Sequence, residues 1–287
     1  MDGRTESIVR RGHLTCHCLL VEADSSLVLI DTGMGLLDVA NPQSRLSAFF
    51  LTLVKPEFRE DMTAVRQIRR MGFDPRDVRH IVMTHLDFDH AGGLDDFPGA
   101  AVHMLASERD AAVAQKSWLD RQRFRPQQWS TRPDWRVHEP GEGEPWFGFN
   151  CVRAIEGLPR EIIMVPLVGH TFGHSGIAVD CGDRWLLQAG DAYFFHAEMD
   201  INEPYCTPGL RFYQWMLEKD RRARLMNQDR LRQLRREHGT EVEIFCGHDL
   251  VEFERLSGRS AEAPAEMIQR PISRWAPPAE QRDESRA

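Results

Sequence analysis

The chain has 287 residues, which is enough for one large domain or two small ones. Hydrophobic residues make up 41% and charged residues 28%, the balance of an ordinary globular protein. The formal net charge of −8 excludes the overall basic surface expected of a nucleic-acid-binding protein. Arginine runs at 221–224 and 230–236 alternate with Asp, Glu and Gln in a helical stretch, so they indicate a solvated helix face.

The N-terminal segment, MDGRTESIVRRGHLTCHCLL, carries charges early and lacks the apolar core of a secretory signal. No stretch approaches 18 apolar residues, so we expect no membrane span and no membrane partner. The six cysteines form no C-x-x-C pair, and we expect reduced thiols in a cytoplasmic protein. Cys16-His17-Cys18 resembles a metal pattern, but a structural zinc needs four ligands and wider cysteine spacing, so we do not predict a site there.

Short apolar runs along the chain end abruptly in glycine or polar residues, which is typical of buried strands. These runs are Leu27–Ile30, Ile81–Met83, Ile162–Val168, Trp185–Leu187 and Val242–Cys246.

Helical patterns separate some of the apolar runs. Val65, Ile68 and Met71 recur at helical spacing between Thr63 and Met71, and Gly72 is a plausible stop. A longer amphipathic stretch runs from about Gly209 to His238. Mixed strands and helices predict a layered α/β or α+β domain, with a site where the loops after the strands converge.

The segment from Thr84 to Gly93 carries the strongest chemical signal. It places His85, Asp87, Asp89 and His90 within six residues, directly after an apolar strand. Imidazole and carboxylate together suit zinc, iron, manganese or cobalt. A solvent-facing polar turn is the alternative, but the density of ligand types favours a metal site.

This segment resembles the H-x-H-x-D-H signature of the metallo-β-lactamase superfamily. Further motifs of that family follow in order over about residues 13–256. They are Asp31-Thr32-Gly33, Gly169-His170-Thr171-Phe172-Gly173-His174-Ser175, Gly190-Asp191 and Gly247-His248-Asp249. The resemblance implies an α/β fold, the four-layer αβ/βα sandwich, with metals at one edge between the sheets. It gives a hydrolase domain over residues 1–258 with a variable loop at 36–60, and a Pro- and charge-rich tail at 259–287.

The resemblance also implies a role for each matched residue. Two divalent metal ions are expected: the first held by His85, Asp87 and His174, the second by Asp89, His90 and His248, with Asp191 bridging them. Two such ions share a water and lower its pKa, which supplies a metal-bridging hydroxide. Asp89 and Asp191 are thus also the expected catalytic carboxylates. Asp31 is expected to orient a ligand or the loop, and His170 to play a structural or supporting part.

Asp87 departs from the family, where the common residue is His. Zinc is the expected metal, but a carboxylate at this position makes iron, manganese or cobalt possible. The flavodiiron branch of the fold also has a carboxylate here, so a di-iron redox enzyme is an alternative. We expect no companion flavodoxin domain of the kind found in that branch.

Three details resemble the N-acyl homoserine lactonase-like branch: H-A-G-G-L after Asp89, L-I-D-T-G-M at the first strand, and the final G-H-D. They predict hydrolysis of a lactone or other carboxylic ester of small size; a β-lactam, thioester or phosphoester is the alternative. Tyr193 is the candidate hydrogen-bond donor to the reacting carbonyl, because Phe194 occupies the position where lactonases have Tyr. Apolar residues within 36–60 predict either a substrate lid or a homodimer contact.

Overall fold

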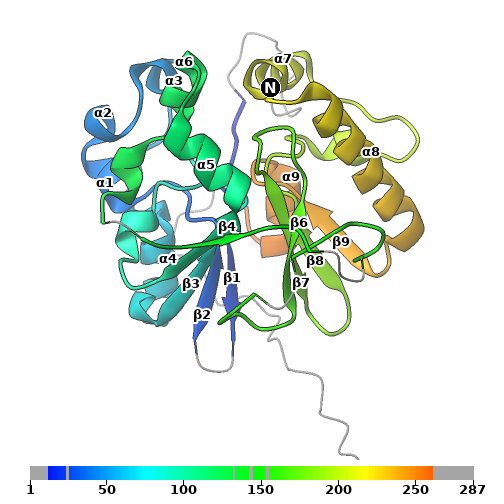
Figure 1. The fold of residues 1–287 in the computed structure, drawn as a ribbon, viewed down its shortest axis with the longest axis horizontal. Coiled ribbons are helices and arrows are strands. Elements are labelled where there is room, and N and C mark those ends of the chain that lie inside the picture. Colours follow the sequence, from blue (N-terminus) through cyan, green and yellow to red (C-terminus); the bar gives the residue numbers. More distant parts are fainter. Residues whose placement is uncertain (1–11, 24–25, 132, 142–144, 153–154, 261–287) are drawn as a thin grey trace, which may run out of the picture.

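The computed structural model describes residues 12–23, 26–131, 133–141, 145–152 and 155–260. The tail expected at 259–287 therefore lies almost entirely outside the described residues. Two sheets stand side by side in the middle of the molecule, with helices on the outer face of each (Figure 1). This arrangement confirms the expected four-layer α/β sandwich. Within the described residues, no helix is long and apolar enough to cross a membrane.

The first sheet has the order β1-β2-β3-β4-β5. Its first two strands pair antiparallel, and the remaining neighbours pair parallel. The strands are β1 (Leu19–Glu22), β2 (Leu27–Ile30), β3 (Val78–Val82), β4 (Ala101–Leu105) and β5 (Asp134–His138).

The second sheet has the order β6-β7-β8-β9, antiparallel except for the parallel pair β8 and β9. Its strands are β6 (Ile162–Pro166), β7 (Ser175–Asp180), β8 (Trp185–Gln188) and β9 (Val242–Phe245). The α-helices are α1 (Leu36–Ala40), α2 (Pro42–Arg45), α3 (Ala48–Leu53), α4 (Ala64–Arg70), α5 (Ala106–Ala114), α6 (Trp118–Arg123), α7 (Pro208–Leu217), α8 (Arg221–His238) and α9 (Leu250–Ser257).

Strand β2 illustrates why the layers form. All four of its residues are buried, as expected of a strand covered on both faces. Leu27 and Leu29 join the core that includes residues of α4 and α5, whereas Val28 and Ile30 join the core shared with β6 and β7. Side chains alternate along a strand, so one strand contacts both a helix layer and the opposite sheet.

Two predicted elements differ in detail from the structure, whereas the helix predicted between Thr63 and Met71 is confirmed as α4. The segment 36–60, predicted as a variable loop, contains the short helices α1, α2 and α3. The stretch predicted to run from Gly209 to His238 breaks into α7 and α8. The break follows from two contacts: Asp220 caps α8 by accepting from the Ala223 amide, and the Lys219 and Asp220 amides donate to the Gly169 carbonyl.

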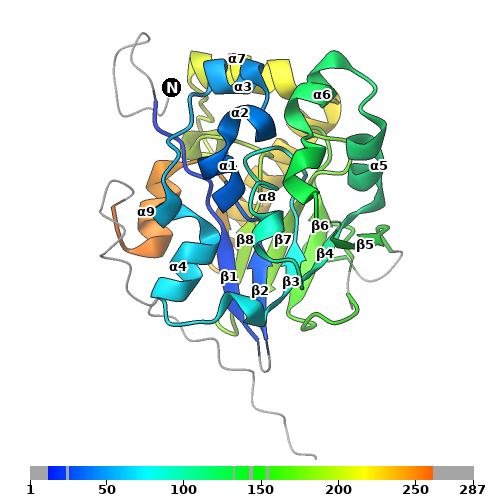
Figure 2. The same cartoon turned by 90° about the vertical axis from the view of Figure 1, so that its left-hand side faces the viewer.

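The loops that follow β3, β6, β8 and β9 carry the predicted metal ligands, and the loop after β2 carries Asp31. Figure 2 shows α2, α3, α6 and α7 at one end of the molecule, above the ends of these strands. Short helices therefore surround the edge where the loops converge.

Candidate metal centre

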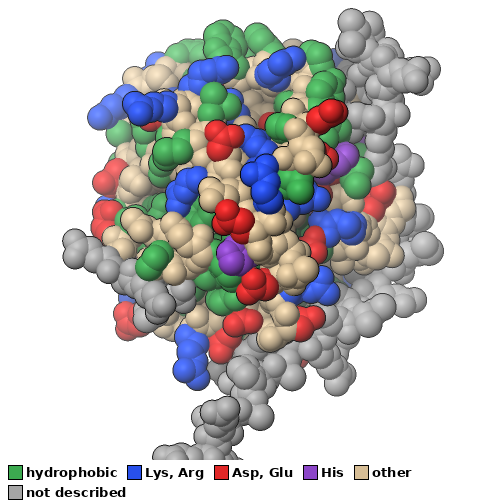
Figure 3. Space-filling model, turned by 90° about the vertical axis from the view of Figure 1, so that its right-hand side faces the viewer, with side chains coloured by type: hydrophobic (Ala, Val, Ile, Leu, Met, Phe, Trp, Pro, Cys, Tyr) green, Lys and Arg blue, Asp and Glu red, His purple; other side chains and the backbone are tan. Residues whose placement is uncertain are grey.

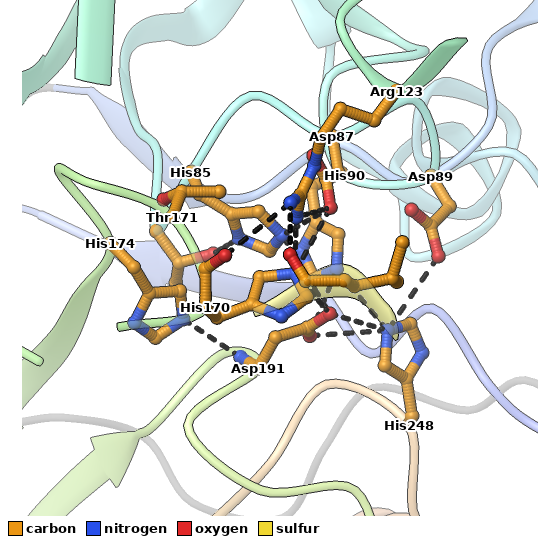
Figure 4. A network of polar contacts seen from close by, with 12 residues as sticks. His85, Asp87, Asp89, His90, Arg123, His170, Thr171, His174, Asp191 and His248 are labelled. Carbon is orange, nitrogen blue, oxygen red and sulfur yellow. Dashed lines mark hydrogen bonds and ion pairs between the residues drawn. The ribbon is translucent and has the colours of Figure 1, made fainter. Parts of the chain in front are cut away.

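Asp191 lies between two groups of potential metal ligands (Figure 4): His85 and His170 approach its Oδ2, His90 approaches its Oδ1, and His248 Nε2 lies within 3.3 Å of both oxygens. We call the first the His248 half, formed by Asp89, His90, His248 and Asp191 Oδ1. The second is the Asp87 half, formed by His85, Asp87, His170 and Asp191 Oδ2.

In the His248 half, Asp191 Oδ1 lies 3.2 Å from His90 Nε2 and 3.1 Å from His248 Nε2. The two imidazole nitrogens lie 3.3 Å apart, and Asp89 Oδ2 lies 3.6 Å from His248 Nε2. Ligand atoms at about 2.0–2.2 Å from one tetrahedral ion are about 3.4 Å apart. The spacing of His90, His248 and Asp191 thus fits a single metal ion, whereas Asp89 groups with His248 and Cys16. Buried Asp191 Oδ1 has no hydrogen-bond partner among the described residues.

The two histidines of the His248 half are each fixed from behind. His90 Nδ1 lies 2.8 Å from Asp31 Oδ2, and His248 Nδ1 lies 2.6 Å from the Thr15 carbonyl. Such contacts fix the tautomer, so that Nε2 faces the metal. The position of Asp31 agrees with its expected orienting role.

Cys16 lies closer to the centre than the sequence suggested. The His17 amide donates to the Gly247 carbonyl at 2.8 Å, which holds the N-terminal segment against the loop after β9. The Cys16 thiol consequently groups with Asp89 and His248, with ligand atoms within 4.8 Å of one another. Cys16 is exposed as a residue, but desolvation of its thiol beside the centre, together with the charge of Asp89, raises the pKa of that thiol above its usual value.

In the Asp87 half, His85 Nε2 lies 3.4 Å from Asp87 Oδ2 and 3.7 Å from Asp191 Oδ2. His170 Nε2 lies 3.0 Å and 3.3 Å from the same two oxygens. His85 is fully buried and its Nδ1 contacts Thr84 Oγ1 at 2.9 Å, but its Nε2 has no hydrogen-bond partner among the described residues. A metal ion would satisfy that His85 nitrogen.

His170, and not His174, reaches this centre, which differs from our expectation. His174 Nδ1 lies 2.9 Å from the Leu167 carbonyl, and its Nε2 accepts from the Asp191 amide at 2.8 Å. Both ring nitrogens are therefore occupied by backbone, and His174 positions Asp191 instead. The tight fit requires Gly190, which has a φ of +53° and where a Cβ would lie 2.6 Å from His174 Nε2.

Arg123 is a site residue that sequence reasoning missed. It is the last residue of α6 and is fully buried beside Asp87. Its Nε donates to Asp87 Oδ1 at 2.6 Å and its Nη2 to Asp87 Oδ2 at 2.5 Å. An arginine in the helical segment WLDRQR carries no signal that separates it from a surface arginine, and 36 residues separate it from its partner.

Glu108 is a second residue without a sequence signal. From α5 it accepts hydrogen bonds from the Leu86 amide, the Thr171 hydroxyl and the Gly173 amide. Burial raises the pKa of Glu108 to about 7. This carboxyl therefore joins the loop that carries Asp87 to the loop that carries His170.

Tyr193 does not point into the metal centre. Its hydroxyl is fully buried and donates to the Glu252 carboxylate at 2.9 Å. The adjacent Phe194 instead stacks on the His248 ring, with ring centroids 4.9 Å apart. Tyr213 of α7 lies edge-on to Phe194, and burial together with the charges of Asp89 and Asp87 raises the pKa of its phenol. Tyr213 is thus the phenol whose surroundings include the centre.

The ionisable groups at the centre shift one another's pKa values. Burial disfavours a charged His248, but the Asp191 and Asp89 carboxylates outweigh it and raise the pKa of His248 to about 8. Burial likewise acts against ionisation of Asp191, yet the surrounding histidines, His248 first, hold its pKa well below the usual value. Asp191 is therefore an anion, as a carboxylate that binds a metal must be.

An apolar cluster packs around Phe88, in the loop that carries Asp87 and Asp89. Phe88, which lies between two of the candidate ligands, packs with Leu46, Phe50 and Leu217. The Phe50 and Phe88 rings are 4.5 Å apart. The segment 36–60 therefore contacts the loop that carries Asp87 and Asp89. Farther out, α7 exposes Phe212 and Trp215; on the face in Figure 3, apolar side chains gather at the upper end and charges of both signs mix below.

The layered fold and this donor set define a metal-dependent hydrolase. The chain belongs to the metallo-beta-lactamase superfamily, whose profile matches residues 11–232. It is 40% identical over 238 residues to a probable metallo-hydrolase of Mycobacterium tuberculosis, covering 82% of this chain and 75% of that protein. An N-acyl homoserine lactonase of Bacillus thuringiensis is 30% identical over 107 residues, or 37% of this chain and 43% of that protein.

Solved structures agree on the fold. A structure of an N-acyl homoserine lactone hydrolase with its product N-hexanoyl-L-homoserine at the catalytic metal centre superposes with a TM-score of 0.63 at 20% identity. The match covers 89% of this chain and 90% of that one. A structure of a probable metal-dependent hydrolase from Staphylococcus aureus gives a TM-score of 0.59 at 18% identity, over 83% and 75% of the two chains.

Proposed function

We propose that the chain hydrolyses a lactone or another carboxylic ester of small size. The observation that carries this proposal is the convergence of imidazole and carboxylate donors on the two oxygens of Asp191. Divalent ions bound there would polarise a carbonyl oxygen and lower the pKa of a water. Relatives with lactone-hydrolysing names support the substrate class.

The ligand set follows from the contacts above. Asp89, His90 and His248 would hold one ion, His85, Asp87 and His170 another, and Asp191 would contact both. Zinc suits the imidazole-rich set, and Asp87 also admits iron, manganese or cobalt. This assignment replaces His174 with His170 as a ligand.

The protein's own residues have distinct parts in the reaction. The Asp89 side chain is 15% exposed, against 4% for His248 and 3% for Asp191, so substrate would approach from the Asp89 side. Asp31 and the Thr15 carbonyl hold the two imidazoles in place. Tyr213 packs edge-on against Phe194, which stacks on His248, and its phenol is the candidate donor to the developing oxyanion, a role proposed for Tyr213 in place of Tyr193.

A substrate panel tests this proposal. Purified protein with measured metal content is assayed on N-acyl lactones, aliphatic esters, thioesters, a β-lactam and a phosphotriester. We expect the highest kcat/KM on a lactone or ester, and a large loss of it in Asp191→Ala. Tyr193→Phe is the matched control and should keep wild-type kcat/KM. Faster turnover of a β-lactam, thioester or phosphotriester would move the assignment to another hydrolase, and oxygen consumption without hydrolysis would favour the di-iron redox alternative.

A further inference from the structure

Arg123 occupies the Asp87 half in a position that the protein fixes from several sides. Besides the two bonds to Asp87, its Nη1 donates to the Leu217 carbonyl at 2.7 Å and to the His170 carbonyl at 3.3 Å. Its Nη2 lies 2.7 Å from His170 Nε2. The guanidinium is thus held by α7, by the loop after β6 and by the loop after β3 that carries Asp87. A buried arginine with this many hydrogen-bond partners is held in one specific position.

His170 Nε2 can serve only one partner. A neutral imidazole nitrogen has either one lone pair or one proton. If it accepts from Arg123 Nη2, its lone pair cannot coordinate a metal; if it is protonated, it donates to Asp87 Oδ2 at 3.0 Å and again cannot coordinate. A metal ion and the present Arg123 contact therefore compete for the same nitrogen.

The other ring nitrogen of His170 also lacks the hydrogen-bond support that the metal-facing histidines of the centre have. The Nδ1 atoms of His85, His90 and His248 each contact an oxygen that orients Nε2 toward the centre. His170 Nδ1 is buried and has no hydrogen-bond partner among the described residues. Metal-ligating histidines nearly always have such a partner, and its loss weakens metal binding. The Asp87 half lacks at His170 the support that the His248 half has at both of its histidines.

Charge adds to this competition. Arg123 donates to both oxygens of Asp87. The carboxylate that departs from the family pattern is therefore already neutralised by a cation of the protein itself. A divalent ion entering beside it meets a fixed positive charge in a water-poor site, where repulsion is weakly screened. The guanidinium cannot leave, because a buried arginine without its carboxylate is strongly unfavourable.

We propose that Arg123 is an internal cation of the Asp87 half, so that the chain holds one metal ion tightly in the His248 half and a second only weakly. The proposal concerns metal affinity and is independent of the substrate. Its failure is therefore distinguishable from failure of the hydrolase assignment, which the substrate panel tests.

Metal titration tests this proposal without reference to turnover. Chelator-stripped protein is titrated with Zn²⁺ by calorimetry, and retained metal is counted by mass spectrometry after dialysis. The wild type should retain one equivalent, with the second bound at least about 100-fold more weakly. Arg123→Met frees Asp87 and His170, so the second equivalent should bind at least about tenfold more tightly. The double variant Asp87→His with Arg123→Met removes the buried carboxylate as well and should retain two equivalents.

Arg121→Met is the matched control, because Arg121 lies on the same helix but is exposed, and its guanidinium donates to the Gln115 carbonyl, away from the centre. It should leave the titration unchanged. Two equivalents of equal affinity in the wild type would overturn the proposal. So would a weaker second equivalent in folded Arg123→Met, since Arg123 would then only orient Asp87 as a ligand. If Arg123→Met does not fold, the wild-type titration and the double variant decide the matter.

Discussion

The two halves of the metal centre have similar donor spacing and different support. Contacting donor atoms lie 3.1–3.3 Å apart among His90, His248 and Asp191, with Asp89 3.6 Å from His248, and contacting donor atoms of the Asp87 half lie 3.0–3.7 Å apart. Behind His90 and His248 lie hydrogen-bond acceptors that aim Nε2 at the ion. Behind Asp87 and His170 lies Arg123, a cation that uses the same donor atoms. Ligand identity and spacing alone therefore do not determine metal affinity; what contacts the ligands from behind also decides it.

The largest effect is expected where the halves meet. Asp191 faces both halves, so Asp191→Ala should lower the affinity for both ions by more than about 100-fold, the upper end of what loss of an outer partner causes. Nearly all hydrolysis should be lost with them. Metal retained after dialysis and kcat/KM are the measurements. Retention of both ions at wild-type turnover would show that Asp191 does not join the halves.

A pair of histidine variants separates the halves. His248→Ala should abolish retention of the tightly bound ion, because it removes a ligand that the Thr15 carbonyl orients. His170→Ala should leave that ion bound and affect only the weak second equivalent. Mass spectrometry of the dialysed variants measures the difference. Equal metal loss in both variants would contradict the asymmetry.

Loss of the carboxylate that contacts His90 should have a smaller effect on metal affinity. Asp31→Asn keeps the shape but replaces the carboxylate that contacts His90 Nδ1, so affinity for the tight ion should fall about 10–100-fold. Asparagine tolerates the left-handed backbone at this position, where φ is +53°. Calorimetric titration gives the affinity. An unchanged value would mean that Asp31 supports the loop alone.

The smallest expected effect is a change in the free energy of unfolding with pH, caused by the buried Glu252. Burial raises the pKa of Glu252 to about 7, above its ordinary value of 4.5. The folded state thus binds a proton that the unfolded state has released, and this contribution is full below about pH 4.5 and is lost as pH rises through 7. The free energy of unfolding should fall by about 1–3 kcal/mol from pH 5 to pH 8. Glu252→Gln should reduce that slope in urea titrations; an unchanged slope would assign the pH dependence to other groups.

The sequence predicted the layered fold and most of the centre, because the ligands of this family follow strand ends in short motifs. The structure brings the side chains of these motifs close together, and their metal-binding roles stay predictions: His85, Asp87, Asp89, His90, Asp191 and His248. The choice between His170 and His174 could not be made from the motif. It depends on the Leu167 carbonyl and the Asp191 amide, whose positions arise only from the folded loops.

Other features depend on contacts between distant segments. The hydroxyl of Tyr193 is directed by Glu252, 59 residues away. Arg123 reaches Asp87 across 36 residues and Leu217 across 94. No local periodicity encodes such pairings, because an amphipathic pattern distinguishes buried from exposed positions and not one buried partner from another.

The most direct test of the unequal halves is a crystal structure of the wild-type protein grown with one equivalent of Zn²⁺, with anomalous scattering measured at the zinc edge. The account predicts one strong anomalous peak among Asp89, His90, Asp191 and His248, and an Arg123 guanidinium still bound to both oxygens of Asp87. Two peaks of equal height, or a single peak between His85, Asp87 and His170 with Arg123 displaced, would contradict it.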